Sequence, residues 1–229
     1  MKLFIQKLLR NALNIEIRRV NHTNRKEYPR IMNEFHIRRM IYFYDLHSQI
    51  KGINGDIVEC GVGWGSSLFY FSICVGLFDK IRHIYGFDSF EEGFPELLKV
   101  DEPSGLKKGG MSITEDQVRR YLRNGKISQD FISDHITFVN GFFDETLAKY
   151  SELEIALLHL DVDLYQSYKE CLEIAYPKVV KGGIIAFDEY QNPIKYPGAK
   201  KAIDEFLVES NETIIKSSIF DRYYLVKSN

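Results

Sequence analysis

The chain has 229 residues, of which 45% are hydrophobic and 27% are charged, a composition typical of a soluble globular protein. Its 30 basic and 32 acidic residues give a formal net charge of −2, which argues against a nucleic-acid partner. The apolar runs are too short for a membrane span, so stable membrane insertion is not expected. The 3 cysteines form no CxxC pair and are expected to be buried thiols, which favours a reducing, cytoplasmic location.

The first 55 residues lack a regular alternation of strands and helices and predict two or three helices. We expect residues 1–55 to form a helical cap on a single α/β unit that comprises residues 56–229. The first fifteen residues are basic and amphipathic, and they are expected to pack on the domain or on a partner subunit, which makes a homodimer plausible. A helix that anchors the chain to a membrane surface is the alternative. No small-residue cleavage site follows, which argues against a secretory signal.

Strand and helix patterns alternate from Asp56 onward. Apolar runs typical of strands occupy residues 56–62, 83–88, 135–141, 154–163 and 182–190, and helical patterns occupy residues 66–78, 114–124, 165–180 and 199–210. Thr114 and Gln117 have the spacing of a capping box at the start of the second helix. Residues 91–110 are rich in glycine, proline and lysine and predict a mobile loop, whereas residues 213–227 predict two further strands.

This alternation predicts right-handed βαβ units and a mostly parallel sheet. The strands are apolar along most of their length, which is typical of strands that helices cover on both faces. The expected fold class is therefore α/β: a Rossmann-like, doubly wound, mostly parallel seven-stranded sheet with helices on both faces and a helical cap before it.

A glycine-rich turn follows the first predicted strand and contains Gly61, Gly63 and Gly65. Glycines at this turn allow the backbone to approach a ligand closely, although many α/β turns need them for geometry alone. Ser66 occupies the place of the third glycine of the dinucleotide fingerprint, which disfavours an NAD(P)-dependent oxidoreductase. Asp88 ends the second predicted strand at the usual place of a ribose-binding carboxylate, or it caps the turn that follows. Together these features favour a ligand that carries adenosine.

Acidic residues end two neighbouring predicted strands. Asp161 and Asp163 end the fourth strand, where they would share a face, and Asp188 and Glu189 end the fifth. Ligands bind at the carboxyl ends of parallel strands, so these side chains are expected to converge on a site for Mg²⁺, Mn²⁺ or Ca²⁺. The alternative role, capping the next helix, is an even choice for Asp163 and the weaker one for Asp161 and Asp188. His159 is expected to point into the domain.

Five segments share an order and spacing with a known family: GDIVECGVGWGSS, GFDSFEEGFPE, GFFDETL, LLHLDVDLYQSYKECLEIAYPKVVKGG and IIAFDEY. Together they resemble the macrocin O-methyltransferase (TylF/MycF) family over roughly residues 55–206. The resemblance implies a class I S-adenosylmethionine-dependent methyltransferase that requires a divalent cation, usually Mg²⁺. Its expected acceptor is a hydroxyl of a sugar or glycosylated small molecule. A non-catalytic nucleotide-binding domain is a further alternative, which the acidic cluster disfavours because unused buried carboxylates are costly.

The resemblance also implies roles for particular residues. The cofactor site would comprise Glu59, Gly61, Gly63, Trp64, Ser66, Asp88, Ser89, Phe90, Gly141, Phe142 and Asp161. Asp161, Asp188 and Glu189 match the metal positions, and the family commonly has aspartate where Glu189 stands. The expected catalytic residues are Asp161, as general base, and Asp163, as second choice for that role. Residues 27–35 and 91–112 would close over the acceptor.

Overall fold

The computed structural model describes residues 33–78 and 82–228. The chain divides after Asn33, and the unit from Glu34 onward contains the sheet and its helices. The predicted amphipathic segment and most of the predicted cap lie outside the described residues, so the boundary at residue 55 stays a prediction. Among the described helices, none has the length and apolar character needed to cross a membrane.

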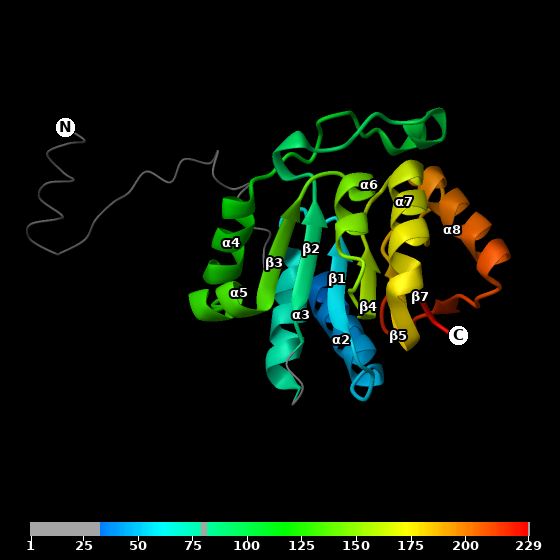
Figure 1. The fold of residues 1–229 in the computed structure, drawn as a ribbon. Coiled ribbons are helices and arrows are strands. Elements are labelled where there is room, and N and C mark those ends of the chain that lie inside the picture. Colours follow the sequence, from blue (N-terminus) through cyan, green and yellow to red (C-terminus); the bar gives the residue numbers. More distant parts are fainter. Residues whose placement is uncertain (1–32, 79–81, 229) are drawn as a thin grey trace, which may run out of the picture. The chain divides into compact units, whose positions relative to one another are not determined.

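Seven strands form one sheet in the order β3-β2-β1-β4-β5-β7-β6 (Figure 1). The neighbours from β3 to β5 pair in parallel, whereas β7 is antiparallel to both β5 and β6. The strands are β1 (Asp56–Cys60), β2 (Ile84–Asp88), β3 (Ile136–Asn140), β4 (Ile155–Leu160), β5 (Val179–Phe187), β6 (Ile215–Lys216) and β7 (Tyr223–Val226). The predicted doubly wound, mostly parallel sheet is confirmed.

Helices cover both faces of the sheet and create two hydrophobic layers (Figure 1). One layer contains side chains of α2 (Glu34–Gln49), α3 (Ser66–Leu77), α4 (Glu115–Asn124) and α5 (Gln129–His135). The other contains side chains of α6 (Phe143–Thr146), α7 (Tyr165–Ala175) and α8 (Pro197–Ser210). Adjacent strand residues alternate between the layers, since Ile57 lies in the first and Val58 in the second. Each is fully buried, which stabilises the fold by about 1.5–3 kcal/mol per side chain.

The region around α7 differs from its prediction. The predicted helix 165–180 is wrong at its end, because α7 stops at Ala175 and a short 3₁₀ turn contains Pro177. Proline lacks the N–H group that would continue the helical ladder. Strand β5 then begins at Val179, three residues before the predicted strand, and two β-branched valines start it.

Helix α5 was not predicted from the pattern of apolar residues. Its signal is a polar cap: the Ser128 hydroxyl accepts a hydrogen bond from the Phe131 N–H group at 3.1 Å. The predicted capping box of α4 is confirmed, since the Thr114 hydroxyl accepts from the Gln117 N–H while the Gln117 side chain accepts from the Thr114 N–H. Both caps fix the starts of helices that pack in the same hydrophobic layer as α2 and α3.

Candidate active site

A cavity of about 430 Å³ opens where β1, β2, β3 and β4 end, a volume within the range of small-molecule sites. Its wall includes most of the predicted cofactor residues: Gly61, Gly63, Trp64, Ser66, Asp88, Ser89, Gly141, Phe142 and Asp161. The loop after β2 contributes Phe94, Pro95, Glu96 and Met111. The cavity thus lies at the edge of the sheet where a doubly wound fold binds its ligands.

The glycine turn at this cavity is fixed by close backbone contacts. Gly61 has a φ of 87°, and a Cβ atom there would overlap the carbonyl oxygen of Asp161. Only glycine therefore lets the end of β1 pass so close to the end of β4. The Gly63 N–H group donates to Asp88 Oδ2 at 2.9 Å, and the Phe90 N–H group donates to Asp88 Oδ1 at 2.7 Å. Asp88 consequently both lines the cavity and caps the turn after β2.

A second cavity adjoins the first and is strongly acidic. Its wall includes Asp161, Asp163, Asp188 and Glu189, together with polar residues of the β5–α8 connection and Arg222. Asp161 and Asp163 belong to the walls of both cavities. These two carboxylates therefore lie where the two cavities adjoin.

Two arginines from distant parts of the chain neutralise this acidic edge. Arg39 of α2 is 8% exposed, and its Nη2 atom lies 3.1 Å from Asp161 Oδ2 and 3.2 Å from Asp188 Oδ1. The same nitrogen donates to the Ser67 hydroxyl at 2.9 Å. Arg222 binds Asp188 with two nitrogens, at 3.0 and 3.1 Å, in the bidentate geometry that makes arginine–carboxylate pairs strong. These contacts, with Arg39 foremost, hold the pKa of Asp188 well below its usual range despite its burial.

Comparison with known proteins now identifies the family. A model of the macrocin-O-methyltransferase (TylF) family matches residues 11–220. The chain belongs to this family.

Relatives and solved structures agree with this assignment. The chain is 31% identical over 164 residues to demethyldecarbamoylnovobiocin O-methyltransferase of Streptomyces niveus, an alignment that covers 68% of this chain and 59% of the relative. It is 34% identical over 148 residues to a rhamnosyl-tetracenomycin-C 4'-O-methyltransferase of Streptomyces olivaceus, with 61% of this chain and 54% of the relative covered. These alignments span less than two thirds of either relative. The calicheamicin methyltransferase CalS11 superposes with a TM-score of 0.74 and 26% identity, covering 99% of this chain and 91% of CalS11.

Two residues that the TylF resemblance assigns to the cofactor lie outside the first cavity. Glu59 is 1% exposed and Phe90 is fully buried. The Glu59 carboxylate contacts His159, with 3.0 Å between Oε1 and Nδ1. Burial raises the pKa of Glu59, and the histidine opposes that rise. A role of Glu59 at the cofactor stays a prediction. Its carboxylate in any case orients the His159 ring through this contact.

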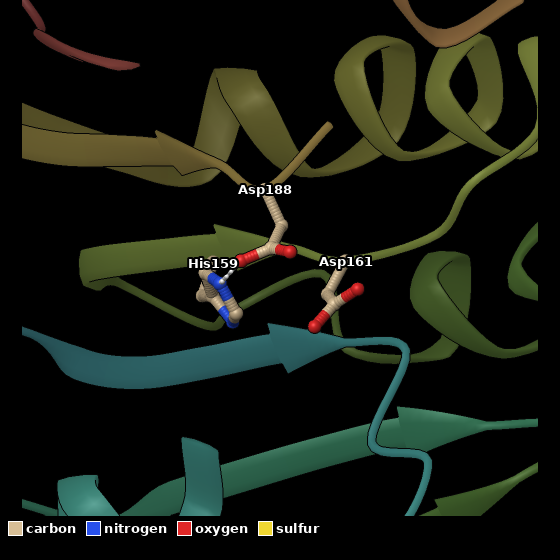
Figure 2. Close-up of side chains that lie close together, drawn as sticks. All are labelled: His159, Asp161 and Asp188. Carbon is tan, nitrogen blue, oxygen red and sulfur yellow. Dashed lines mark ion pairs between the residues drawn. The ribbon is translucent and has the colours of Figure 1, made fainter. Parts of the chain in front are cut away.

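His159 joins the acidic cluster from inside the domain. Its Nε2 atom lies 3.9 Å from Asp188 Oδ1, and one potential ligand atom from each of His159, Asp161 and Asp188 lies within 4.8 Å of the others (Figure 2). Burial disfavours the charged ring, but the nearby Asp188 carboxylate and the hydrogen-bonded Glu59 outweigh it and raise the pKa of His159 to about 9. The ring is therefore a third cation beside Arg39 and Arg222.

Asp163 does not cap the helix that follows it, so that interpretation is wrong. The N-cap residue of α7 is Leu164, which makes no side-chain cap, and Asp163 has a left-handed backbone with a φ of 58°. Strand β4 ends at Leu160, so the expectation that Asp161 and Asp163 share a strand face is also wrong. Burial and the negative charges of Asp161 and Asp188 raise the pKa of Asp163 to about 7.

Glu189 is more enclosed than the other predicted metal ligands. It is 3% exposed, and the Tyr168 hydroxyl donates a hydrogen bond to its Oε2 atom. Burial and the surrounding aspartates raise the pKa of Glu189 well above its usual range. Its carboxyl lines the acidic cavity but does not join the close group of ligand atoms formed by His159, Asp161 and Asp188.

Sequence reasoning missed Arg39 and Arg222. Arg39 had a detectable signal, because it precedes the buried Phe43 by four residues and Leu46 by seven and therefore lies on the apolar face of α2. A buried arginine at such a position requires an acidic partner. Arg222 had no such signal, since it is the last residue of the short connection between β6 and β7.

Proposed function

We propose that this TylF-family chain is an S-adenosylmethionine-dependent O-methyltransferase that acts on a hydroxyl of a sugar in a glycosylated small molecule and uses a divalent cation. The observation that supports it best is that Asp161 and Asp163 line both cavities. A methyl donor in the first cavity and a hydroxyl in the second would meet beside carboxylates able to accept the hydroxyl proton.

The names of related proteins support the choice of acceptor class. The relative from Streptomyces olivaceus is named for methylation of a rhamnosyl group, and one from Micromonospora griseorubida is a mycinamicin III 3''-O-methyltransferase. One solved structure of CalS11 is described as a TDP-rhamnose 3'-O-methyltransferase. Because the aligned regions leave a large part of the curated relatives uncovered, the acceptor and the position methylated are not transferred to this chain.

S-adenosylmethionine would supply an electrophilic methyl group. For this ligand, each oxygen of Asp88 accepts one backbone N–H group and retains a lone pair for a ribose hydroxyl. Gly61 and Gly63 bring the backbone against the cavity, and Phe142 contributes an aromatic side chain to its wall. We assign the ribose to Asp88 on this geometry.

Calorimetry tests the cofactor. The protein is expected to bind S-adenosylmethionine at least tenfold more tightly than NAD⁺, and Asp88→Ala is expected to weaken that binding tenfold or more because two buried backbone donors lose their acceptor. Asp56→Ala is the matched control, since Asp56 accepts the His83 N–H group at 2.9 Å near the opposite ends of the strands. Preference for NAD⁺, or an equal effect of both variants, would contradict the assignment.

We assign the general base to Asp163 ahead of Asp161, the reverse of the order expected from the sequence. Burial and the charge of Asp188 raise the pKa of Asp161, but its Oδ2 atom is held in an ion pair with Arg39, which opposes that rise and leaves the carboxylate less free to accept a proton. Within residues 33–78 and 82–228, Asp163 forms no ion pair, and its carboxyl reaches both cavities. Asp161 then serves to orient the acceptor and to hold Arg39.

The residues of the acidic cavity fit a divalent cation. Glu59, Asp161 and Asp188 face three cationic groups, whereas in the described part of the chain Asp163 and Glu189 form no ion pair. Carboxylate oxygens are the preferred protein ligands of Mg²⁺, and a cation in this cavity would offset the repulsion between carboxylates that helps to raise the pKa values of Asp163 and Glu189. Asp161, Asp188 and Glu189 would hold it, with Asp188 using a lone pair left free by the arginines. The cation would lower the pKa of a bound hydroxyl.

Binding of Mn²⁺, followed by electron paramagnetic resonance, tests the cation site without turnover. Saturable binding is expected, and Asp161→Asn is expected to weaken it tenfold or more because one ligand charge is lost. Asp221→Asn is the control, since Asp221 lines the same cavity but is exposed and pairs with Lys216 at 2.9 Å. Absence of saturable binding, together with full methyl transfer in chelator, would refute a metal requirement.

A further inference from the structure

The loop between β2 and α4 crosses the carboxyl ends of the strands and reaches α7 and α8 (Figure 1). Near its two ends it supplies Phe94 and Met111 to the wall of the cofactor cavity. Its middle contains a short 3₁₀ helix, Lys99–Ser104, which packs against α8. The loop was predicted to be mobile, yet one of its acidic residues is buried.

That residue is Asp101, which is 2% exposed although its neighbour Glu102 is exposed. Its Oδ1 atom accepts a hydrogen bond from the Tyr165 N–H group at 2.9 Å. Tyr165 is the first residue of α7, whose N-cap residue, Leu164, has no side-chain acceptor. Asp101 therefore provides the missing cap of α7 from 64 positions earlier in the chain.

The same carboxylate also lies against the first turn of α8. A Cβ atom on Gly198, the second residue of α8, would overlap Asp101 Oδ1. No left-handed backbone requires glycine there, so close approach of the carboxylate is the reason for it. Asp101 thus sits between the amino ends of two helices of 11 and 14 residues, where the helix dipoles favour negative charge.

We infer that Asp101 is a positioning residue that fastens the loop over the cofactor cavity and, through the same bond, fixes the segment that contains both candidate catalytic carboxylates. That segment, residues 161–165, is held at its start by the Asp161 N–H group, which donates to the Cys60 carbonyl at 3.0 Å. Its end is held by Asp101. Between them Asp163 has a strained left-handed backbone, which persists only if both ends are fixed.

A double-mutant cycle between Asp101 and Gly198 tests the inference. Gly198→Ala alone is expected to displace the carboxylate, to speed hydrogen exchange of the Tyr165 amide at least tenfold, and to weaken S-adenosylmethionine binding by about tenfold. In an Asp101→Ala background the same substitution is expected to change both quantities severalfold less than in the wild-type protein, because the overlap with the carboxylate is gone and only the contact with the Tyr165 Cβ atom, at 3.0 Å, remains. Asp101→Asn keeps an oxygen that can accept the Tyr165 N–H group, so hydrogen exchange of that amide is expected to be slow in this variant, unlike in Asp101→Ala.

Gly76→Ala is the matched control, since Gly76 is an exposed glycine in α3 with no atom within 4 Å of an added Cβ. Additive effects of Asp101→Ala and Gly198→Ala, or an effect of Gly198→Ala no larger than that of Gly76→Ala, would overturn the inference. The effect on the cofactor rests on the proposed function, whereas hydrogen exchange is measured on the protein alone. If the wild-type protein binds no S-adenosylmethionine, the proposed function fails. Hydrogen exchange of the Tyr165 amide still decides whether Asp101 fixes the start of α7.

Discussion

Asp163→Asn is expected to lower kcat for methyl transfer by about 10²–10⁴-fold, the usual contribution of a general base. Asparagine has nearly the same shape but cannot accept the proton of the acceptor hydroxyl. Because Asp163 forms no ion pair among the residues that the structure describes, the substitution leaves no buried cation without its partner. The variant should therefore fold normally and bind S-adenosylmethionine with unchanged affinity, which calorimetry can verify.

The pH dependence provides a second readout for the same residue. The pKa of Asp163 is raised to about 7 by burial and by the charges of Asp161 and Asp188, and a cation bound to those two carboxylates would lower it, so kcat/KM is expected to rise with pH at or below that value as the carboxyl becomes a base. A raised pKa also means that the charged form destabilises the fold, an effect that appears as pH rises through the unfolded and then the folded pKa. Asp163→Asn should thus raise the Tm at pH 8 but not at pH 4. Retained activity, or an unchanged Tm difference across this range, would refute the assignment.

Arg39→Met is expected to cost about 3–5 kcal/mol of unfolding free energy, because it leaves Asp161 and Asp188 in a poorly solvated site without their shared partner. Methionine fills much of the same volume, so the loss measures the charge and its hydrogen bonds rather than a cavity. Denaturant unfolding at pH 7 gives the free energy. Arg39→Lys is expected to be intermediate, since lysine keeps the charge but its shorter side chain does not place a nitrogen where Arg39 Nη2 contacts both carboxylates.

Arg38→Met is the matched control for this prediction. Arg38 adjoins Arg39 on α2 and pairs with Glu34 at 2.9 Å, but its side chain is 56% exposed. Exposed pairs of this kind contribute about 0–1 kcal/mol. Similar losses for the two variants would show that the cluster at Asp161 and Asp188 does not depend on Arg39.

The acidic cluster shows where sequence patterns stop being informative. Asp161 and Asp188 were placed together because parallel strands end at one edge of the sheet, and the order β1-β4-β5 brings them there. The rule about strand ends does not predict their cationic partners, since Arg39 is 122 and 149 residues away from them in the chain. Nothing in the pattern around Arg222 indicates that it reaches Asp188 across the antiparallel pair of β5 and β7.

Helix caps show the same limit at shorter range. The cap of α4 was readable because Thr114 and Gln117 are three residues apart and bond to each other. The same local reasoning made Asp163 an even choice for the cap of α7, but the structure places Asp101 there. A local rule cannot find an acceptor that a loop delivers from another part of the fold.

The sequence by itself determined the α/β class, the positions of the principal strands and helices, the glycine turn and the acidic strand ends, because burial periodicity and turn chemistry act between residues a few positions apart. Only the tertiary structure decided which charges pair, that Asp161 but not Asp163 has an ionic partner among the residues described, and that Asp101 holds the loop over the cavity. Those outcomes depend on strand order and loop path, which bring together groups that no short window of sequence contains.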